Sequence, residues 1–152
     1  MRSKKVKPIT VAVSGGFDPL HSGHLKLIQA AGKLGDKLVV ILNNDQWLKR
    51  KKGYVFMPQD ERKKILEFLV GVDRVLLTGH AANPKDMSVS AELRKLRPDI
   101  FANGGDRTRK NIPEAAICKS LGCRTVFGVG GKKVQSSSWL LEKFGRCGQC
   151  QK

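Results

Sequence analysis

Two of the chain's three histidines lie three positions apart, where an apolar run gives way to a helical pattern. They belong to the stretch "SGGFDPLHSGHLKLIQAAGKLG", residues 14–35. Gly15 and Gly16 end the apolar run, and because they lack a Cβ their backbone can approach a phosphate closely and adopt a positive φ if required. His21 and His24 follow at the start of the helical pattern, which is the positive end of a helix dipole. We therefore expect this turn to bind an anion.

The residue types in this turn suit chemistry at phosphorus. Ser22 is the predicted N-cap of the helix, and Asp18 shapes the turn before it. Gly23, between the histidines, leaves room for a bulky ligand. His21 and His24 can donate hydrogen bonds to phosphate oxygens on which negative charge grows during substitution. Two structural histidines are the alternative, but a pair framed by glycines at a strand-to-helix turn favours the catalytic interpretation.

Three later segments, each after an apolar run, carry further polar chemistry. The basic run Lys49–Lys52, expected in a loop, could offset the charge of a triphosphate and a phosphomonoester, or form a solvated or nucleic-acid-binding patch. "NGGDRTRKN" places Asp106 and Arg107 after paired glycines, where main-chain groups can approach a base or ribose. "GGKKVQSSSWLLEKF" opens a helix with three serines, a second N-terminus suited to phosphate, with N-capping by one serine as the alternative.

The order of elements predicts how these segments are brought together. Short β-branched runs over 8–14, 36–43, 72–79, 98–104 and 123–130 alternate with helical patterns over Leu25–Leu34, Gln59–Val70, Met87–Leu96, Pro113–Leu121 and Ser137–Phe144. This alternation predicts one Rossmann-like α/β domain, residues 8–145, with about five parallel strands flanked by helices and tails over 1–7 and 146–152. Ligands of such sheets bind beyond the carboxyl ends of the strands, which the polar segments follow.

Two of the predicted helices carry side chains whose role the pattern leaves open. Ile65 and Leu66 form an apolar side of the helix after residue 59, which leaves Arg62 on the polar side. Arg62 is therefore either a surface arginine or a substrate-binding cation. In the last helix, Trp139 and Phe144 are expected to pack in the core.

Composition limits the class of protein. The chain has 152 residues and 40% hydrophobic residues, and 29 Lys and Arg against 13 Asp and Glu give a formal net charge of +16. Such a balance favours anionic partners, although a Lys-rich surface can serve solubility alone. No apolar run approaches the roughly 18 residues that cross a bilayer, and the N-terminus lacks a secretory h-region. We expect a cytoplasmic protein with no membrane partner.

Four cysteines, Cys118, Cys123, Cys147 and Cys150, raise the question of zinc. The last two form a C-x2-C pair, but no second tight pair accompanies it. Cys118 lies among apolar residues, where a buried thiol behaves as a small hydrophobe. We expect reduced, unliganded cysteines.

The stretch "GGFDPLHSGHL" resembles the G-x-F-D-x-x-H-x-G-H signature of the HxGH nucleotidylyltransferase superfamily. Similarity runs from about Ile9 to Phe144. "LNNDQWLKRKKGYVFMPQDERKKILEFLVGVDRVL" resembles the cytidylyltransferase-like branch, and "LRPDIFANGGDR" is similar to a segment of sugar-phosphate adenylyltransferases. The resemblance implies transfer of a nucleoside monophosphate from a nucleoside triphosphate to a phosphorylated sugar or alcohol, with release of pyrophosphate. It also implies Mg²⁺, held mainly by the nucleotide phosphates.

The resemblance assigns roles to individual residues. His21 and His24 would stabilise the α-phosphate, and Lys52 would contact phosphate. The implied nucleotide- and phosphate-binding residues are Gly15, Gly16, Phe17, Asp18, Gly23, Gly105, Asp106, Arg107, Ser136, Ser137 and Ser138. The serines match the end of the family's R-T-x-G-I-S-T-T motif. Gly131 takes the arginine place and Val134 the glycine place, so Lys132 or Lys133 is expected to supply the missing cation, with Arg62 as a further substrate-binding candidate.

Several alternatives stay open. The base is A or C, the acceptor is unspecified, and archaeal-type FAD synthetase belongs to the same branch. A rival from another class is a non-catalytic basic nucleotide- or RNA-binding protein that keeps this fold. Single-strand binders stack bases on exposed aromatic side chains, whereas most aromatic residues here lie in apolar runs that predict burial. We therefore expect no specific nucleic acid partner, and we leave the oligomeric state open, a homodimer included.

Overall fold

A computed structural model describes residues 7–148, with side chains to residue 146. Five parallel strands form one sheet: β1 (Thr10–Gly15), β2 (Lys37–Leu42), β3 (Arg74–Leu77), β4 (Ile100–Ala102) and β5 (Arg124–Val126). Their order in the sheet is β3-β2-β1-β4-β5. The predicted Rossmann-like α/β class is confirmed; four of the strands lie inside the runs predicted to form them, and β1 extends one residue beyond its run, to Gly15.

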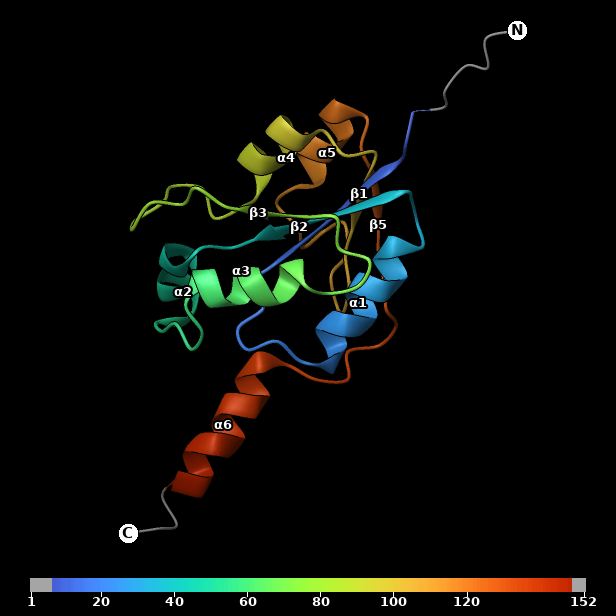
Figure 1. The fold of residues 1–152 in the computed structure, drawn as a ribbon. Coiled ribbons are helices and arrows are strands. Elements are labelled where there is room, and N and C mark those ends of the chain that lie inside the picture. Colours follow the sequence, from blue (N-terminus) through green and yellow to red (C-terminus); the bar gives the residue numbers. More distant parts are fainter. Residues whose placement is uncertain (1–6, 149–152) are drawn as a thin grey trace, which may run out of the picture.

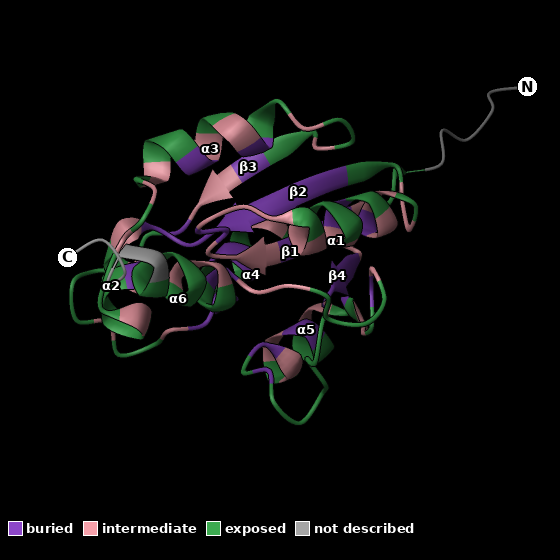
Figure 2. Ribbon diagram, turned by 90° about the horizontal axis from the view of Figure 1, so that it is seen from below, coloured by how far each residue is buried: buried purple, intermediate pink, exposed green. Residues whose placement is uncertain are grey.

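Helices cover both faces of this sheet (Figure 1). They are α1 (Ser22–Gly32), α2 (Asp45–Lys52), α3 (Gln59–Glu67), α4 (Ser90–Leu96), α5 (Ala115–Leu121) and α6 (Ser137–Gly148). Alternate strand residues divide between two cores: Val11 and Val13 pack towards α1 and α3, while Ala12 packs towards α4 and α5. Most of β2 and all of β4 are buried (Figure 2), and β1 is buried over Val11–Val13, as expected for a parallel sheet covered by helices.

Helix α2 is the one element that the sequence pattern did not predict. The run Lys49–Lys52, expected in a loop, forms its last half. Asn44 caps the helix by accepting a hydrogen bond from the Trp47 N–H at 2.9 Å, and Gly53 ends it at φ 81°. Only Leu48 is buried in α2, so the helix lacks the apolar periodicity by which a helix is recognised.

The strand order places a ligand crevice at one edge of the sheet. The chain runs outward from β1 through β2 to β3, then crosses back to β4 on the other side of β1. At such a topological switch point the connections after the two adjacent strands diverge and leave a crevice beyond their carboxyl ends. The crevice expected here lies beyond β1 and β4. None of the helices in residues 7–148 is long and apolar enough to span a bilayer.

Candidate active site

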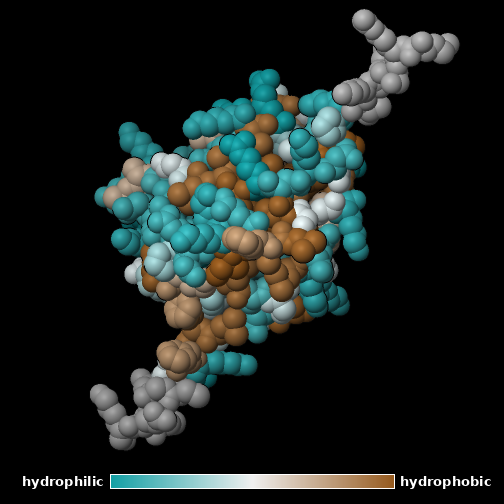
Figure 3. All heavy atoms as spheres, in the orientation of Figure 1, coloured by the Kyte–Doolittle hydropathy of each residue, from teal (hydrophilic) through white to brown (hydrophobic). Residues whose placement is uncertain are grey.

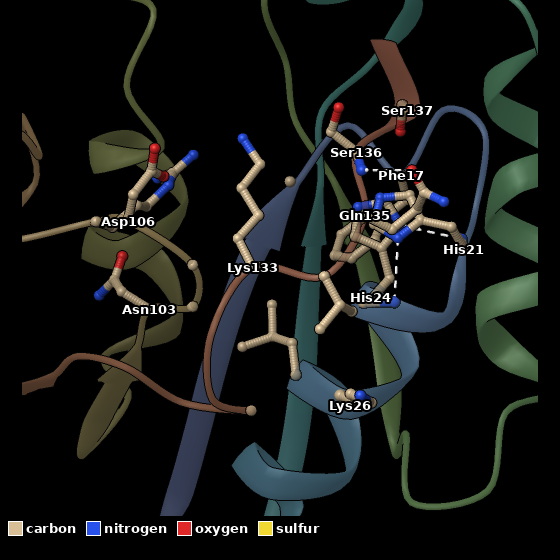
Figure 4. Close-up of a pocket in the computed structure, with 18 of the residues that line it drawn as sticks. Phe17, His21, His24, Lys26, Asn103, Asp106, Lys133, Gln135, Ser136 and Ser137 are labelled. Carbon is tan, nitrogen blue, oxygen red and sulfur yellow. Dashed lines mark hydrogen bonds between the residues drawn. The ribbon is translucent and has the colours of Figure 1, made fainter. Parts of the chain in front are cut away.

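A cavity of about 350 Å³ lies at this switch point (Figure 4). Its walls come from the β1–α1 turn, from the segments that follow β4 and β5, and from α2. Most of the predicted site residues line it: Gly15, Gly16, Phe17, His21, Gly23, His24, Lys52, Gly105, Asp106, Arg107, Lys132, Lys133, Ser136, Ser137 and Ser138. Segments more than 100 residues apart in sequence therefore meet at one site.

The two histidines form a reciprocal cap at the start of α1. The predicted N-cap, Ser22, is wrong by one residue, because His21 caps the helix and Ser22 is its first residue. His21 Nδ1 accepts a hydrogen bond from the Gly23 N–H at 3.1 Å, and His24 Nδ1 accepts one from the His21 N–H at 3.3 Å. The two rings stack with centroids 3.7 Å apart and planes 24° apart. Local backbone bonds thus fix both imidazoles.

These bonds determine where each ring carries its proton. A backbone N–H can only donate, so Nδ1 of each imidazole must be the acceptor and a neutral ring carries its proton on Nε2. Burial lowers the pKa of His24 to about 3, with His21 and Lys52 adding to the effect. Burial also lowers the pKa of His21, and the charges of Lys52 and Lys133 lower it further. At neutral pH the pair therefore presents two Nε2–H donors without positive charge on either ring.

Phe17 and the glycines around it pack the histidine turn tightly. Phe17 has φ 49°, a left-handed conformation that is strained for a side chain of this size, and its buried ring meets His24 edge-on at a centroid distance of 4.8 Å. Gly15 and Gly16 do not adopt positive φ; a Cβ on Gly16 would lie 2.9 Å from Leu48. A Cβ on Gly23 would lie 2.9 Å from the His21 ring, so Gly23 makes room for the imidazole rather than for a ligand.

Lys52 reaches the cavity from the end of α2, whereas Asp18 does not. The Asp18 carboxylate is fully buried and accepts hydrogen bonds from the N–H groups of Phe56 (2.8 Å) and Met57 (2.6 Å). Asp18 therefore fixes the loop after α2 instead of lining the cavity as predicted. Lys52 Nζ donates to the Asp18 carbonyl oxygen at 3.4 Å. Burial lowers the pKa of the Lys52 ammonium, and Asp18 partly offsets this effect.

Arg62 is neither on the surface nor in the cavity, which corrects both predictions for it. The side chain is fully buried. Its guanidinium donates to the carbonyl oxygens of Met57 (2.8 Å), Gly16 (2.7 Å) and Asn43 (2.7 Å), and pairs with Asp45 at 2.6 Å. These partners come from the ends of β1 and β2, from α2 and from the loop before α3. Arg62 thus ties together the elements that carry the histidines and Lys52.

The segment after β4 forms a second wall. Gly105 has φ 64°, and Asp106 and Arg107 follow it, both exposed at the cavity. Asn111 holds this loop closed, because its side chain donates to the Asp106 carbonyl oxygen at 3.1 Å and accepts from the Thr108 N–H at 2.7 Å. Asp106 and Arg107 therefore stand on a loop that hydrogen bonds of its own residues hold together.

The segment after β5 forms the third wall and leads into α6. The packing of α6 differs from the one expected. Ser137 Oγ donates to the Pro19 carbonyl oxygen at 2.9 Å, and Ser136 Oγ accepts from the Trp139 N–H at 3.2 Å, so two of the three serines fix the helix start. Trp139 and Phe144, expected in the core, are 48% and 75% exposed. The helix projects from the body (Figure 1), and apolar surface continues onto its base (Figure 3).

Comparison with known proteins decides the family. The family model described as "Cytidylyltransferase-like" matches residues 12–130, which include the histidine turn, α2 and the wall after β4. The chain belongs to the cytidylyltransferase-like family. This membership agrees with the resemblance that the "HSGH" stretch and the basic run carry.

Relatives of this cytidylyltransferase-like chain include two differently named groups. It is 39% identical over 119 residues to the bifunctional protein HldE of Streptomyces coelicolor, and the match covers 77% of this chain and 24% of HldE. It is 36% identical over 100 residues to the FAD synthase of Pyrococcus abyssi, covering 65% of this chain and 64% of that enzyme. The chain thus spans about a quarter of HldE and less than two thirds of the FAD synthase.

A solved structure gives the same fold. The lipopolysaccharide core biosynthesis protein from Thermoplasma volcanium superimposes with a TM-score of 0.62 and 26% sequence identity. The match covers 86% of this chain and 99% of that protein. The whole cytidylyltransferase-like unit, and not the histidine turn alone, is therefore shared.

Sequence reasoning missed Trp47 in this cytidylyltransferase-like site. Trp47 lines the cavity from α2, and its indole N–H donates to the Met87 carbonyl oxygen at 2.8 Å. Its position just after β2, at the carboxyl edge of the sheet, is the feature of the sequence that could have predicted a place at the cavity. Cys118 and Cys123 are buried and unpaired, while the Cys147 side chain and Cys150 lie outside the described residues.

The expected burial of the aromatic residues is wrong for this cytidylyltransferase-like chain. Five of its nine aromatic side chains are exposed: Tyr54, Phe56, Phe68, Trp139 and Phe144. Tyr54 and Phe56 follow the basic run directly. Aromatic burial therefore gives no argument against the binding of single-stranded nucleic acid.

Proposed function

We propose that the protein is a nucleotidyltransferase that transfers a nucleoside monophosphate from a nucleoside triphosphate to a small phosphorylated sugar or alcohol. The observation that carries this proposal is the histidine pair. Two neutral imidazoles with Nδ1 engaged present their Nε2–H groups at a cavity beside the N-terminus of α1. Donors fixed in this way stabilise charge on a phosphoryl group without forming a covalent intermediate.

The proposed reaction is a single in-line substitution. An oxygen of the acceptor phosphate forms a bond to the α-phosphorus, while the bond from the α-phosphorus to the oxygen bridging to the β-phosphate breaks. That oxygen leaves with the bonding electrons as part of pyrophosphate. His21 and His24 donate to the α-phosphoryl oxygens on which charge grows, and Lys52 offsets the charge of the phosphates. No proton has to leave an acceptor phosphate that is already ionised.

Mg²⁺ belongs to the proposal as a companion of the nucleotide. In the described part of the chain, no group of three or more His, Cys, Asp or Glu side chains could hold a metal by itself. Asp106 is the carboxylate that lines the cavity. Mg²⁺ usually binds through substrate phosphates, water and one or two carboxylates, which fits this arrangement. When bound, the ion would offset phosphate charge.

The proposed reaction has two main forms, which differ in the molecule that accepts the nucleoside monophosphate. Relatives named HldE and FAD synthase are both similar to this chain. A sugar-phosphate acceptor is our main proposal, and an FAD synthase that acts on a phosphorylated flavin is the alternative. We further propose a cytoplasmic location.

One experiment tests reaction and substrate together. The purified protein is incubated with Mg²⁺, each of the four nucleoside triphosphates, and a panel of phosphorylated sugars, phosphorylated alcohols and FMN, and pyrophosphate is measured. We expect release with ATP or CTP and one class of acceptor. A His21→Ala/His24→Ala variant is the control for contaminating activity. Release that is equal in this variant, or absent with every pair, contradicts the proposal.

A nucleic-acid-binding function is the second candidate, because Tyr54 and Phe56 are exposed beside the basic run Lys49–Lys52. Stacking on exposed aromatic rings together with phosphate contacts is the usual basis of single-strand binding. Gel retardation of a single-stranded RNA, measured from low to physiological salt, tests this function. Binding that persists at physiological salt and weakens in a Tyr54→Ala/Phe56→Ala variant supports it, and binding lost with salt marks nonspecific charge attraction.

A further inference from the structure

The cavity holds two lysines in the segment where the family motif carries its arginine, and the structure distinguishes between them. Lys132 and Lys133 both line the cavity and are both exposed. Figure 4 shows Lys133 between Asp106 and the histidine pair. The charge of Lys133 also lowers the pKa of His21, which places its ammonium near that ring. Lys133 is therefore the lysine that faces the reacting groups.

Trp139 holds this lysine from the first turn of α6. The Lys133 ammonium nitrogen lies 5.3 Å from the centroid of the Trp139 ring, within the range of a cation–π contact. Trp139 is 48% exposed, so packing in the core does not account for it. The Trp139 N–H donates to Ser136 Oγ, and the neighbouring Ser137 donates to the Pro19 carbonyl oxygen. The start of α6, which carries Trp139, is thus anchored to the turn before His21.

The segment before Lys133 is rich in glycine, so the contact with Trp139 matters for where the lysine side chain lies. Gly128, Gly130 and Gly131 all have positive φ, and Gly130 packs against the backbone of Leu27. A Cβ on Gly131 would meet nothing within 4 Å, and the lysine side chains that follow are long, with many rotamers open to them. The Trp139 ring, in cation–π contact with the Lys133 ammonium, restricts this freedom.

We infer that Lys133 supplies the phosphate-binding cation in place of the missing arginine, and that Trp139 is a positioning residue that holds Lys133 beside the histidine pair. The inference rests on the proposed transfer reaction for the role of Lys133. The Lys133–Trp139–His21 arrangement itself is independent of it. An exposed cation–π contact is weak, so the expected effect of Trp139 is modest and acts only through Lys133.

A double-mutant cycle on pyrophosphate release tests the role in transfer. Trp139→Leu should lower kcat/KM roughly two- to fivefold, the factor expected for one exposed cation–π contact, and Trp139→Phe should retain most of the activity. Lys133→Gln should lower kcat/KM roughly tenfold, and Lys132→Gln, the matched control, much less. In the Lys133→Gln background Trp139→Leu should have no further effect. A full effect in that background would show a structural role for Trp139 and overturn the inference.

Titration of His21 by NMR in the nucleotide-free protein tests the arrangement without any turnover. His21 is flanked by His24, Lys52 and Lys133. Lys133→Gln and Trp139→Leu should both raise the pKa of His21, and Lys132→Gln should leave it unchanged. If no substrate pair gives pyrophosphate while these shifts appear, the proposed function fails and only the positioning by Trp139 stands. Equal shifts from both lysine variants, or none from Trp139→Leu, overturn the positioning by Trp139.

Discussion

The two ends of the sheet use polar side chains in opposite ways. At the amino end, Asp36, Asp73 and Asp99 each accept a hydrogen bond from a backbone N–H at the start of a neighbouring strand, at 2.7, 2.7 and 2.8 Å. At the carboxyl end, His21 and His24 use Nδ1 for the backbone, and the structure of residues 7–148 shows no partner for Nε2 of either ring. One end satisfies its polar groups within the chain, and the other keeps donors at a cavity.

This difference separates residues that stabilise the fold from residues that act on a ligand. A carboxylate that bridges two strands contributes to folding whether or not a substrate is present. A donor fixed by one atom and directed at a cavity by another gains its partner only when a ligand binds. Substitutions at the two ends should therefore change different measured quantities.

Arg62 gives the strongest test of this separation. It lies at the carboxyl end of the sheet, but all its partners are groups of the chain itself, as at the amino end. Arg62→Met leaves three backbone carbonyl oxygens and Asp45 without their donor. We expect a loss of about 3–5 kcal/mol in the free energy of unfolding, the usual cost of removing one partner of a buried charged group. Urea unfolding measures it.

Lys63→Met is the matched control for Arg62. Lys63 lies on the same helix and pairs only with Glu67 on the surface. An exposed pair of this spacing contributes about 0.3–0.5 kcal/mol, so the control should remain close to the parent. Equal losses in the two variants would contradict the buried role of Arg62.

His24→Ala should produce the largest change in rate. The substitution deletes one preorganised donor but leaves the glycine turn, Lys52 and the other walls. Turnover should fall by roughly 10²–10³, about 2.7–4 kcal/mol, while nucleotide affinity changes far less. Single-turnover measurements and titration calorimetry separate the two. Turnover at the parental rate would remove the catalytic role of the histidine pair.

Lys52→Ala and Lys51→Ala together compare a cation at the cavity with a neighbouring cation on the surface. Lys52 lines the cavity, whereas Lys51 is exposed on α2 and does not. We expect kcat/KM to fall roughly tenfold in Lys52→Ala and by less than about twofold in Lys51→Ala, because a charge next to the phosphate is screened less than a surface charge. Lys4, in the predicted N-terminal tail, would be a more distant control but lies outside the described residues. Similar losses in the two variants would mean that only bulk charge matters.

Asp73→Ala tests the amino end. It removes the acceptor of the Leu38 N–H and should lower the free energy of unfolding by about 1 kcal/mol, a typical value for one hydrogen bond. Turnover should stay at the parental rate, since Asp73 lies at the opposite edge of the sheet. A loss of turnover at full stability would break the separation between the two ends.

Acidification changes stability with a sign that can be checked. The pKa of His24 is about 3 in the folded protein, against 6.5 for an ordinary histidine. Between these values the unfolded chain binds a proton that the folded chain does not, so stability falls as the pH decreases through 6.5. His24→Asn lacks this contribution. Its urea midpoint should fall less than that of the parent between about pH 7 and about pH 4.5, and an equal fall would contradict the depressed pKa.

The sequence by itself determined the histidine turn and the order of the strands and of every helix except α2. Buried parallel strands must be short apolar runs, and the glycines and imidazoles around His21 interact within four positions, so local pattern contains the information. The same locality explains the family resemblance of "HSGH". In this turn the structure moves the N-cap by one position and changes the roles expected of Gly23 and Asp18.

Only the tertiary structure decided what Arg62, Lys133 and Trp139 do. Arg62 looks like a surface residue because helical periodicity reports one face of its own helix, whereas its partners lie up to 46 positions away. Trp139 looks like a core residue because an apolar pattern does not say whether a surface is available to cover it. Lys132 and Lys133 are equivalent in sequence, and the position of the Trp139 ring distinguishes them. Contacts between distant segments, which no local pattern contains, select the residues that complete the site.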